Sequence, residues 1–124
     1  MTLLLDTHVV LWWRQGGRRL SREARAAIAA AAIVHVSAAS AWEVAIKMAI
    51  GRLDLDQPFE AHVREAGFET LPITFAHAAE VARLPRHHAD PFDRMLVAQA
   101  RVERLTLVTH DRAFLAYDVP TLIA

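Results

Sequence analysis

The sequence predicts an α/β fold, a three-layer α/β/α sandwich in which helices cover both faces of a central, mainly parallel sheet of four to five strands. Short apolar segments alternate with longer helical segments along the chain, which is the order typical of a covered parallel sheet. In addition, 124 residues without an internal repeat or linker suffice for one hydrophobic core. We therefore expect residues 1–124 to form a single domain.

The first third of the chain contains two predicted strands with two helices between them. Leu3 to Asp6 is a short apolar run and Ile33 to Ser37 is short and β-branched, so each predicts a buried strand. A helix from Thr7 to Gln15 is ended by the Gly16–Gly17 pair. A second, Ala-rich helix runs from its N-cap Ser21 to Ala31.

The middle of the chain adds two helices and an edge strand. Gly51 ends a helix from Ser40 to Ile50, and Pro58 suits the first turn of a helix that reaches Ala66. Glu69 to Ile73 resembles a short strand, but Pro72 cannot donate a hydrogen bond to a neighbouring strand. We therefore expect this strand at an edge of the sheet.

The last third completes the alternation. Thr74 is the N-cap of a helix to Leu84, and Pro91 opens a longer helix to Arg104. Thr106 to Thr109 then predicts a buried strand. A turn of helix through Tyr117 and a final strand from Val119 to Ile123 follow.

The composition excludes several kinds of protein and site. The 14 basic and 14 acidic residues balance, so the whole molecule has no bulk attraction to nucleic acid. The absence of cysteine excludes disulfides and thiolate metal sites, so oxygen or imidazole must hold any metal. No apolar segment reaches the roughly 20 residues of a membrane span, and the amino terminus lacks a signal-peptide pattern. We expect a cytoplasmic protein without a membrane segment.

Four acidic residues fall where an apolar segment begins or ends, namely Asp6, Glu43, Asp93 and Asp111. Carboxylates at the carboxyl ends of parallel strands lie where open α/β sheets bind ligands, and several there repel one another unless a cation neutralises them. The pattern therefore predicts a metal site. Each acid also has an ordinary interpretation, because Asp before a helix is frequently an N-cap and Glu43 stands four residues before Lys47, the spacing of a helical ion pair. We therefore expect that Glu43 must turn away from Lys47 to join the other acids.

These acids belong to four motifs that follow one another over the whole chain. The motifs are Leu3-Leu4-Leu5-Asp6-Thr7-His8, Ser40-Ala41-Trp42-Glu43-Val44-Ala45-Ile46-Lys47, His88-Ala89-Asp90-Pro91-Phe92-Asp93-Arg94-Met95-Leu96 and Val108-Thr109-His110-Asp111-Arg112-Ala113-Phe114. In this order they resemble the motifs of PIN-domain ribonucleases, and in particular those of the VapC toxins of bacterial toxin–antitoxin pairs. The resemblance implies a single PIN domain over residues 1–124.

The resemblance also implies a function, a metal and partners. It implies a metal-dependent endoribonuclease toxin that cleaves RNA phosphodiester bonds with Mg²⁺ or Mn²⁺, ions that prefer oxygen ligands. Asp6 and Asp93 are then the direct metal ligands, and Glu43 and Asp111 are catalytic residues that orient water or a second ion. The implied partners are a VapB-like antitoxin, whose carboxy-terminal segment lies over the active-site groove, and a second copy of the chain in a homodimer.

Three residues beside the acids are candidates for a supporting role. The hydroxyls of Thr7 and Thr109 can bond a ligating carboxylate or a water, although backbone bonding is the commoner role of such threonines. Asp90 precedes Pro91, where it can cap the following helix or support the rim of the metal site.

A cluster of arginines near the first helix is a candidate for RNA binding. Arg14, Arg18 and Arg19 lie in a short region that is rich in arginine, a side chain that suits bidentate contact with phosphate. A solvated helix surface is the alternative. The adjacent Trp12 and Trp13 continue an apolar run, which favours core or interface packing over base stacking.

Histidines next to the acids raise a zinc hypothesis, which we disfavour. His8, His87, His88 and His110 neighbour the acidic positions, but neighbours in sequence usually point in different directions. None of them has the helical i, i+4 spacing of a zinc motif.

Two other functions compete with the nuclease. A phosphoacceptor receiver domain has a similar length and an acidic pocket, but it needs a lysine after a late strand, and the single lysine, Lys47, stands on an early helix. The third predicted strand also ends without an aspartate to phosphorylate. A non-catalytic RNA-binding or assembly module would tolerate loss of the acids, and all four are present.

Overall fold

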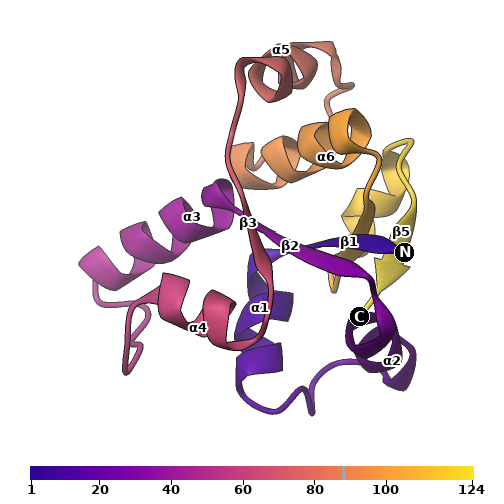
Figure 1. The fold of residues 1–124 in the computed structure, drawn as a ribbon. Coiled ribbons are helices and arrows are strands. Elements are labelled where there is room, and N and C mark those ends of the chain that lie inside the picture. The colour runs from indigo at the N-terminus through magenta and orange to yellow at the C-terminus, as the bar shows by residue number, and fades with distance from the viewer. Residues whose placement is uncertain (88) are drawn as a thin grey trace.

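The computed structural model describes residues 1–87 and 89–124, which form one five-stranded sheet with helices on both faces (Figure 1). The elements are, in chain order, β1 (Thr2–Leu5), α1 (Thr7–Arg14), α2 (Arg22–Ala30), β2 (Ile33–Ser37), α3 (Ala38–Ala49), α4 (Phe59–Glu65), β3 (Glu69–Leu71), α5 (Phe75–Arg83), α6 (Pro91–Glu103), β4 (Thr106–Thr109), the 3₁₀ helix η1 (Arg112–Ala116) and β5 (Thr121–Ile123). The strand order is β3-β2-β1-β4-β5, and all neighbouring strands are parallel. The predicted three-layer α/β/α architecture is confirmed.

Alternating side chains of β1 enter two separate cores. Leu3 and Leu5 pack in the core beneath α1 and α2, whereas Leu4 packs in the core beneath α6. All three side chains are fully buried, because a central strand of a sheet covered on both faces has no solvent side. Figure 1 shows α5 and α6 on one side of the sheet and α1, α2 and α4 on the other.

Most element boundaries lie within one residue of the sequence prediction, and three differ by two residues: the start of α3, the end of β3, which is Leu71 rather than Ile73, and the start of β5. Helix α3 begins at Ala38 rather than at Ser40, because Ser37 is its N-cap and accepts a hydrogen bond of 2.9 Å from the Ala39 backbone N–H. The last strand begins at Thr121 rather than at Val119, since the intervening Pro120 has no N–H to donate.

The edge position of β3 is as predicted. This strand ends at Leu71, directly before Pro72, and its described strand partner is β2. A strand that needs hydrogen bonds on one side only tolerates a proline at its end. The sheet therefore begins at β3 and continues inward through β2 to β1.

The crevice of the fold lies between β1 and β4. The chain proceeds from β1 to β2 and β3 on one side and places β4 and β5 on the other, so that the strand order reverses between β1 and β4. The Asp6 backbone N–H donates to the Val108 carbonyl at 2.9 Å and extends the pairing of these strands to their carboxyl ends. Ligands of open α/β sheets bind at such a reversal point.

Among the residues that the structure describes, no helix has the length and apolar character that a membrane crossing requires.

Candidate active site

A cavity of about 230 Å³ lies at the carboxyl ends of β1 and β4, and we call it the acidic pocket. It is lined by Asp6, Thr7, His8, Glu43, Lys47, Asp90, Asp93, His110, Asp111 and Phe114. The structure thus brings together the four predicted acids from four different parts of the chain. The supporting candidates Thr7 and Asp90 line the same pocket. The catalytic and metal-binding roles of these residues remain predictions.

Asp6 is the buried acid of the pocket, with 4% of its surface exposed. Its Oδ1 accepts a hydrogen bond of 3.0 Å from the Val9 backbone N–H, which makes Asp6 the N-cap of α1. Its Oδ2 accepts a hydrogen bond from the hydroxyl of Thr109, a fully buried residue at the end of β4. The capping role therefore does not compete with a site role, because the cap bond and the hydroxyl together fix the carboxylate at the pocket.

Glu43 projects into the pocket from α3 and keeps its ion pair with Lys47. Its Oε1 accepts a hydrogen bond of 2.6 Å from the Thr7 hydroxyl, whose oxygen lies 2.9 Å from Ser40 Oγ. Its Oε2 lies 3.5 Å from Lys47 Nζ. We expected from the sequence that Glu43 would have to turn away from Lys47, and this is wrong because both residues line the same cavity.

Asp93 and Asp90 enter the pocket from the start of α6. Asp90 is the N-cap, and its Oδ1 accepts hydrogen bonds from the backbone N–H groups of Phe92 at 2.8 Å and Asp93 at 3.1 Å. Asp93 lies in the first turn of the helix. The positive end of the helix dipole favours negative charge at this position. Asp90 therefore has the predicted capping role, at the rim of the pocket.

Asp111 follows β4 and begins η1. Its Oδ1 accepts a hydrogen bond of 2.9 Å from the Ala113 backbone N–H, and its own N–H donates to Thr109 Oγ1 at 3.0 Å. Thr109 therefore bonds both to the backbone of Asp111 and to the carboxylate of Asp6. One buried hydroxyl thus connects the two acids that stand at the ends of β1 and β4.

Two histidines also converge on the acidic pocket. The rings of His8 and His110 are 4.7 Å apart in an edge-to-face arrangement, and His110 Nδ1 lies 3.5 Å from Asp6 Oδ2. The hydrogen bond with Asp6 raises the pKa of His110. Burial lowers the pKa of His8, although the Asp6 carboxylate acts in the opposite direction.

The expectation that the histidines point away from the acids is therefore wrong for His8 and His110. Sequence reasoning missed them because it compared neighbours along the chain, whereas the pairing of β1 with β4 places the two strand ends side by side. The ring of His87 instead contacts Tyr117, with 5.2 Å between centroids. His88 lies outside the described residues.

A second cavity, of about 260 Å³, shares His8 and Lys47 with the acidic pocket, and we call it the cationic groove. It is lined by His8, Leu11, Trp12, Arg14, Gln15, Arg19, Lys47, Arg52, Leu53, Asp54 and Leu55. Of the three predicted RNA-binding arginines, Arg14 and Arg19 line the groove, whereas Arg18 is exposed and is not among its lining residues. The Arg19 guanidinium carbon lies 5.5 Å from the centre of the Trp12 ring.

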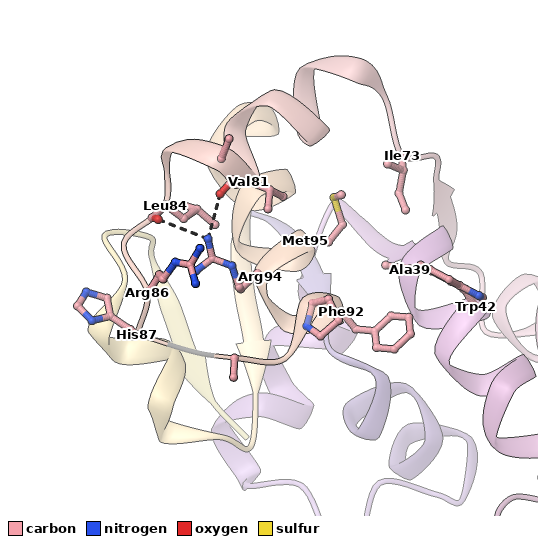
Figure 2. Close-up of a pocket in the computed structure, with 13 residues that line it drawn as sticks. Ala39, Trp42, Ile73, Val81, Leu84, Arg86, His87, Phe92, Arg94 and Met95 are labelled. Carbon is pink, nitrogen blue, oxygen red and sulfur yellow. Dashed lines mark hydrogen bonds between the residues drawn. The ribbon is translucent and has the colours of Figure 1, made fainter.

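A larger cavity, of about 990 Å³, is mostly apolar and lies between α3, α5 and α6 (Figure 2). None of its described lining residues is one of the four acids. Trp42 and Phe92 are sequence neighbours of Glu43 and Asp93, and their rings meet edge to face at 5.1 Å on this side. The apolar pocket therefore lies beside the acidic pocket and separate from it.

The donor set of the acidic pocket fits a hard divalent cation. Its carboxylates supply oxygen ligands, which Mg²⁺ and Mn²⁺ prefer. Lys47 and the amino-terminal ends of α1 and α6 offset only part of the negative charge that gathers there. A cation would offset the remainder, so the residues present are compatible with the predicted metal.

The comparisons with known proteins agree with one another. The model of the family "PIN domain" matches residues 3–120. Ribonuclease VapC22 of Mycobacterium tuberculosis is 37% identical over 127 residues, which cover 96% of this chain and 94% of that protein.

Solved structures with the same fold come from several bacteria. VapBC2 from Rickettsia felis, bound to a DNA fragment from its promoter, gives a TM-score of 0.75 at 12% identity and covers 99% of this chain and 98% of the matched chain. VapBC-5 from Mycobacterium tuberculosis, a member of the VapBC family of toxin–antitoxin systems, gives 0.69 at 22% identity with the same coverage. At these identities the structures show the fold.

Proposed function

The chain belongs to the PIN-domain family, and we propose that it is a VapC-like endoribonuclease that acts as the toxin of a toxin–antitoxin pair with Mg²⁺ or Mn²⁺. The observation that supports this most is the convergence of Asp6, Glu43, Asp93 and Asp111 in one pocket at the strand-order reversal. A relative named as a ribonuclease is similar over almost the whole chain. The family decides against the receiver-like alternative, and the full set of acids disfavours a non-catalytic module.

Asp6 and Asp93 are the residues that we propose as direct ligands of the metal ion. Asp6 is held by Val9 and Thr109, and Asp93 is held by its place in the first turn of α6. A divalent ion there would stabilise negative charge on the phosphodiester and make an attacking water more acidic.

The remaining residues of the pocket position these groups. Thr7 donates to Glu43, so one oxygen of this carboxylate is fixed while Lys47 approaches the other. We propose that Glu43 and Asp111 orient the attacking water, with Thr7, Asp90 and Thr109 as supporting residues. Rigid acceptors at fixed positions favour in-line attack because they limit the orientations of the water.

We propose that the RNA backbone leaves the acidic pocket through the cationic groove. Lys47 lines both cavities, and Arg14 and Arg19 line the groove beyond it. The Nε of Arg14 is buried and has no hydrogen-bond partner among the described atoms, so the terminal nitrogens of this guanidinium are the groups that we propose for phosphate contact. Arg18 lies outside the groove, and we propose only a peripheral contact for it.

Two protein partners complete the proposal. The solved relatives include complexes named VapBC, which supports a VapB-like antitoxin for this chain. Trp42 and Ile46 of α3 and its C-cap residue Ile50 recur at every fourth position with 62%, 40% and 61% of their surfaces exposed, and we call these three residues the apolar stripe. A helix face of this kind normally marks an interface, and we propose that it lies in a homodimer. RNA as the substrate implies action in the cytoplasm.

The test compares Asp6→Asn and Asp93→Asn with the wild-type chain and with Asp118→Asn, whose carboxylate is exposed and outside the acidic pocket. We expect cleavage of RNA by the first two variants to fall by at least about 100-fold, the loss typical of removing one electrostatic stabiliser. Sequencing of RNA 5′ ends after brief expression would identify the cleaved sites. Thermal unfolding of each variant would establish that the fold is intact.

Full activity of both purified Asn variants would contradict the metal-site proposal. Activity of the wild-type chain in excess EDTA would contradict the metal requirement. If Asp118→Asn also lost activity, the losses in the other two variants would reflect a general effect on the folded protein and not a role of Asp6 and Asp93 in cleavage.

A further inference from the structure

Asp6, His8 and His110 form a mixed carboxylate and imidazole cluster at the mouth of the acidic pocket. Each residue offers one ligand atom, and the three atoms lie within 4.8 Å of one another. The residues come from three places in the fold: the end of β1, the first turn of α1 and the end of β4. Their convergence is therefore a product of the strand pairing.

The arrangement places a buried anion behind two accessible imidazoles. Asp6 is buried, whereas His8 and His110 are exposed. The centroid of the Trp12 ring lies 5.0 Å from that of His110 and 6.0 Å from that of His8, so this indole borders both imidazoles. Because both rings are exposed, they can rotate toward a shared ion. Helix α1 and strand β4 meanwhile hold the backbone of the two histidines in place.

The ligand atoms of Asp6, His8 and His110 differ in kind from the carboxylate oxygens that we propose for Mg²⁺ or Mn²⁺. Two imidazoles and one carboxylate are ligands typical of Zn²⁺, which binds three protein ligands and keeps a fourth position for water or substrate in its open sites. Mg²⁺ prefers oxygen and keeps several waters. Affinities of such a nitrogen and oxygen site also rise along the transition-metal series from Mn²⁺ to Cu²⁺ before they fall at Zn²⁺, and imidazole suits Zn²⁺ while carboxylate suits Mg²⁺ and Mn²⁺.

We propose that Asp6, His8 and His110 bind a divalent transition-metal ion that prefers imidazole, such as Zn²⁺, and that this ion inhibits cleavage by taking Asp6 from the Mg²⁺ or Mn²⁺ site. Asp6 is shared by the two donor sets, and two dications at the same carboxylate repel each other. The inhibitory part rests on the proposed nuclease function. The binding part concerns only the three side chains.

Binding is tested first, without RNA. The full chain, free of any histidine tag and stripped with EDTA, is titrated with Zn²⁺ by calorimetry and with Co²⁺ while the visible absorption of the ion and the fluorescence of the indoles are recorded. The variants are His8→Gln and His110→Gln. His87→Gln is the matched control, because His87 is also exposed but contacts Tyr117 and does not line the acidic pocket.

We expect one tight equivalent of Zn²⁺ in the wild type and in His87→Gln. Affinity in His8→Gln and in His110→Gln should fall by at least about 10- to 100-fold, the loss that even a change in a metal's outer shell causes. Co²⁺ should quench indole fluorescence in the wild type but much less in the two variants. Equal Zn²⁺ affinity in all four proteins would overturn the binding proposal, as would tight binding that survives when His8→Gln and His110→Gln are combined in one chain.

Inhibition is tested separately, with RNA and a fixed concentration of Mg²⁺ or Mn²⁺. Micromolar Zn²⁺ should slow cleavage by the wild type, added Mn²⁺ should restore it, and His8→Gln should need at least about 10-fold more Zn²⁺ for the same effect. Acceleration by Zn²⁺, or equal inhibition of wild type and variant, would overturn the inhibitory part. If the wild type cleaves no RNA under any condition, the nuclease proposal fails while the zinc titrations still decide the binding part.

Discussion

Thr109 donates its hydroxyl hydrogen to the carboxylate of Asp6, although 103 positions separate the two residues in the chain. The bond joins the ends of β1 and β4 at the point where the strand order reverses. The pairing of these two strands therefore both builds the sheet and holds the carboxylate of Asp6 in place at the candidate site.

Replacing this hydroxyl should weaken metal binding. In Thr109→Val the carboxylate loses a donor while the volume of the side chain is kept, so we expect stability to fall by about 1.5–3 kcal/mol, as for hydrogen bonds to charged groups. The Mg²⁺ concentration for half-maximal cleavage should rise roughly 10- to 100-fold. A Mg²⁺ titration of activity measures this, and Thr109→Ser should restore most of the wild-type value. An unchanged Mg²⁺ requirement in the valine variant would show that the hydroxyl has only a structural role.

The arginines should differ in their contribution to RNA binding. Arg19 lines the cationic groove and Arg18 does not, although they are neighbours in sequence. If the RNA backbone occupies the groove, Arg19→Ala should reduce the slope of log affinity against log salt by about 0.7, the value for one phosphate of a single strand. Arg18→Ala is the matched control and should leave the slope near the wild-type value. The slope is measured by fluorescence anisotropy with labelled RNA and the inactive Asp6→Asn background.

Arg94 should stabilise the folded protein. Its guanidinium donates to the carbonyls of Val81 at 3.0 Å and Leu84 at 3.4 Å (Figure 2) and to that of Pro85 at 2.9 Å, and so satisfies acceptors at the end of α5. We expect Arg94→Met to lower the free energy of unfolding by about 1.5–3 kcal/mol in urea denaturation. Arg94→Lys should recover little of this loss, since a single ammonium cannot match the fork of the guanidinium. Wild-type stability of the methionine variant would contradict the prediction.

The exposed face of α3 should control the oligomeric state. Ile50 is 61% exposed, and Ile50→Glu places a charge on the apolar stripe. We expect the wild-type chain to sediment as a dimer and this variant as a monomer in analytical ultracentrifugation. Leu115→Glu is the control, because Leu115 is 48% exposed but lies on η1, away from the stripe. A wild-type chain that is monomeric at all concentrations would refute the homodimer.

Local patterns predicted the elements of the fold with small errors. Apolar runs, N-caps and the Gly16–Gly17 pair identified all five strands and the helices between them, because these signals depend on residues close in sequence. The errors at Ser37 and Pro120 have the same origin. Each is a single residue that shifts a boundary by two positions, Ser37 through the hydroxyl that caps α3 and Pro120 through its missing N–H.

The identity of the four acids was also predictable, since each stands at a recognisable segment end. Their partners were not. We expected Glu43 either to pair with Lys47 or to join the pocket. In the structure it does both, because Lys47 lines the same cavity. Likewise, no local signal indicates that His8 and His110 meet.

The sequence by itself thus determined the order of the elements, the parallel sheet and the acids at its rim, because hydrophobic periodicity and capping are local properties. Tertiary structure alone decided which donors face one another. The register between β1 and β4 aligns residues that lie about a hundred positions apart, and it assembles Asp6, Thr109, His8 and His110 into one environment. Such alignment depends on packing across the sheet, which no short segment of the chain encodes.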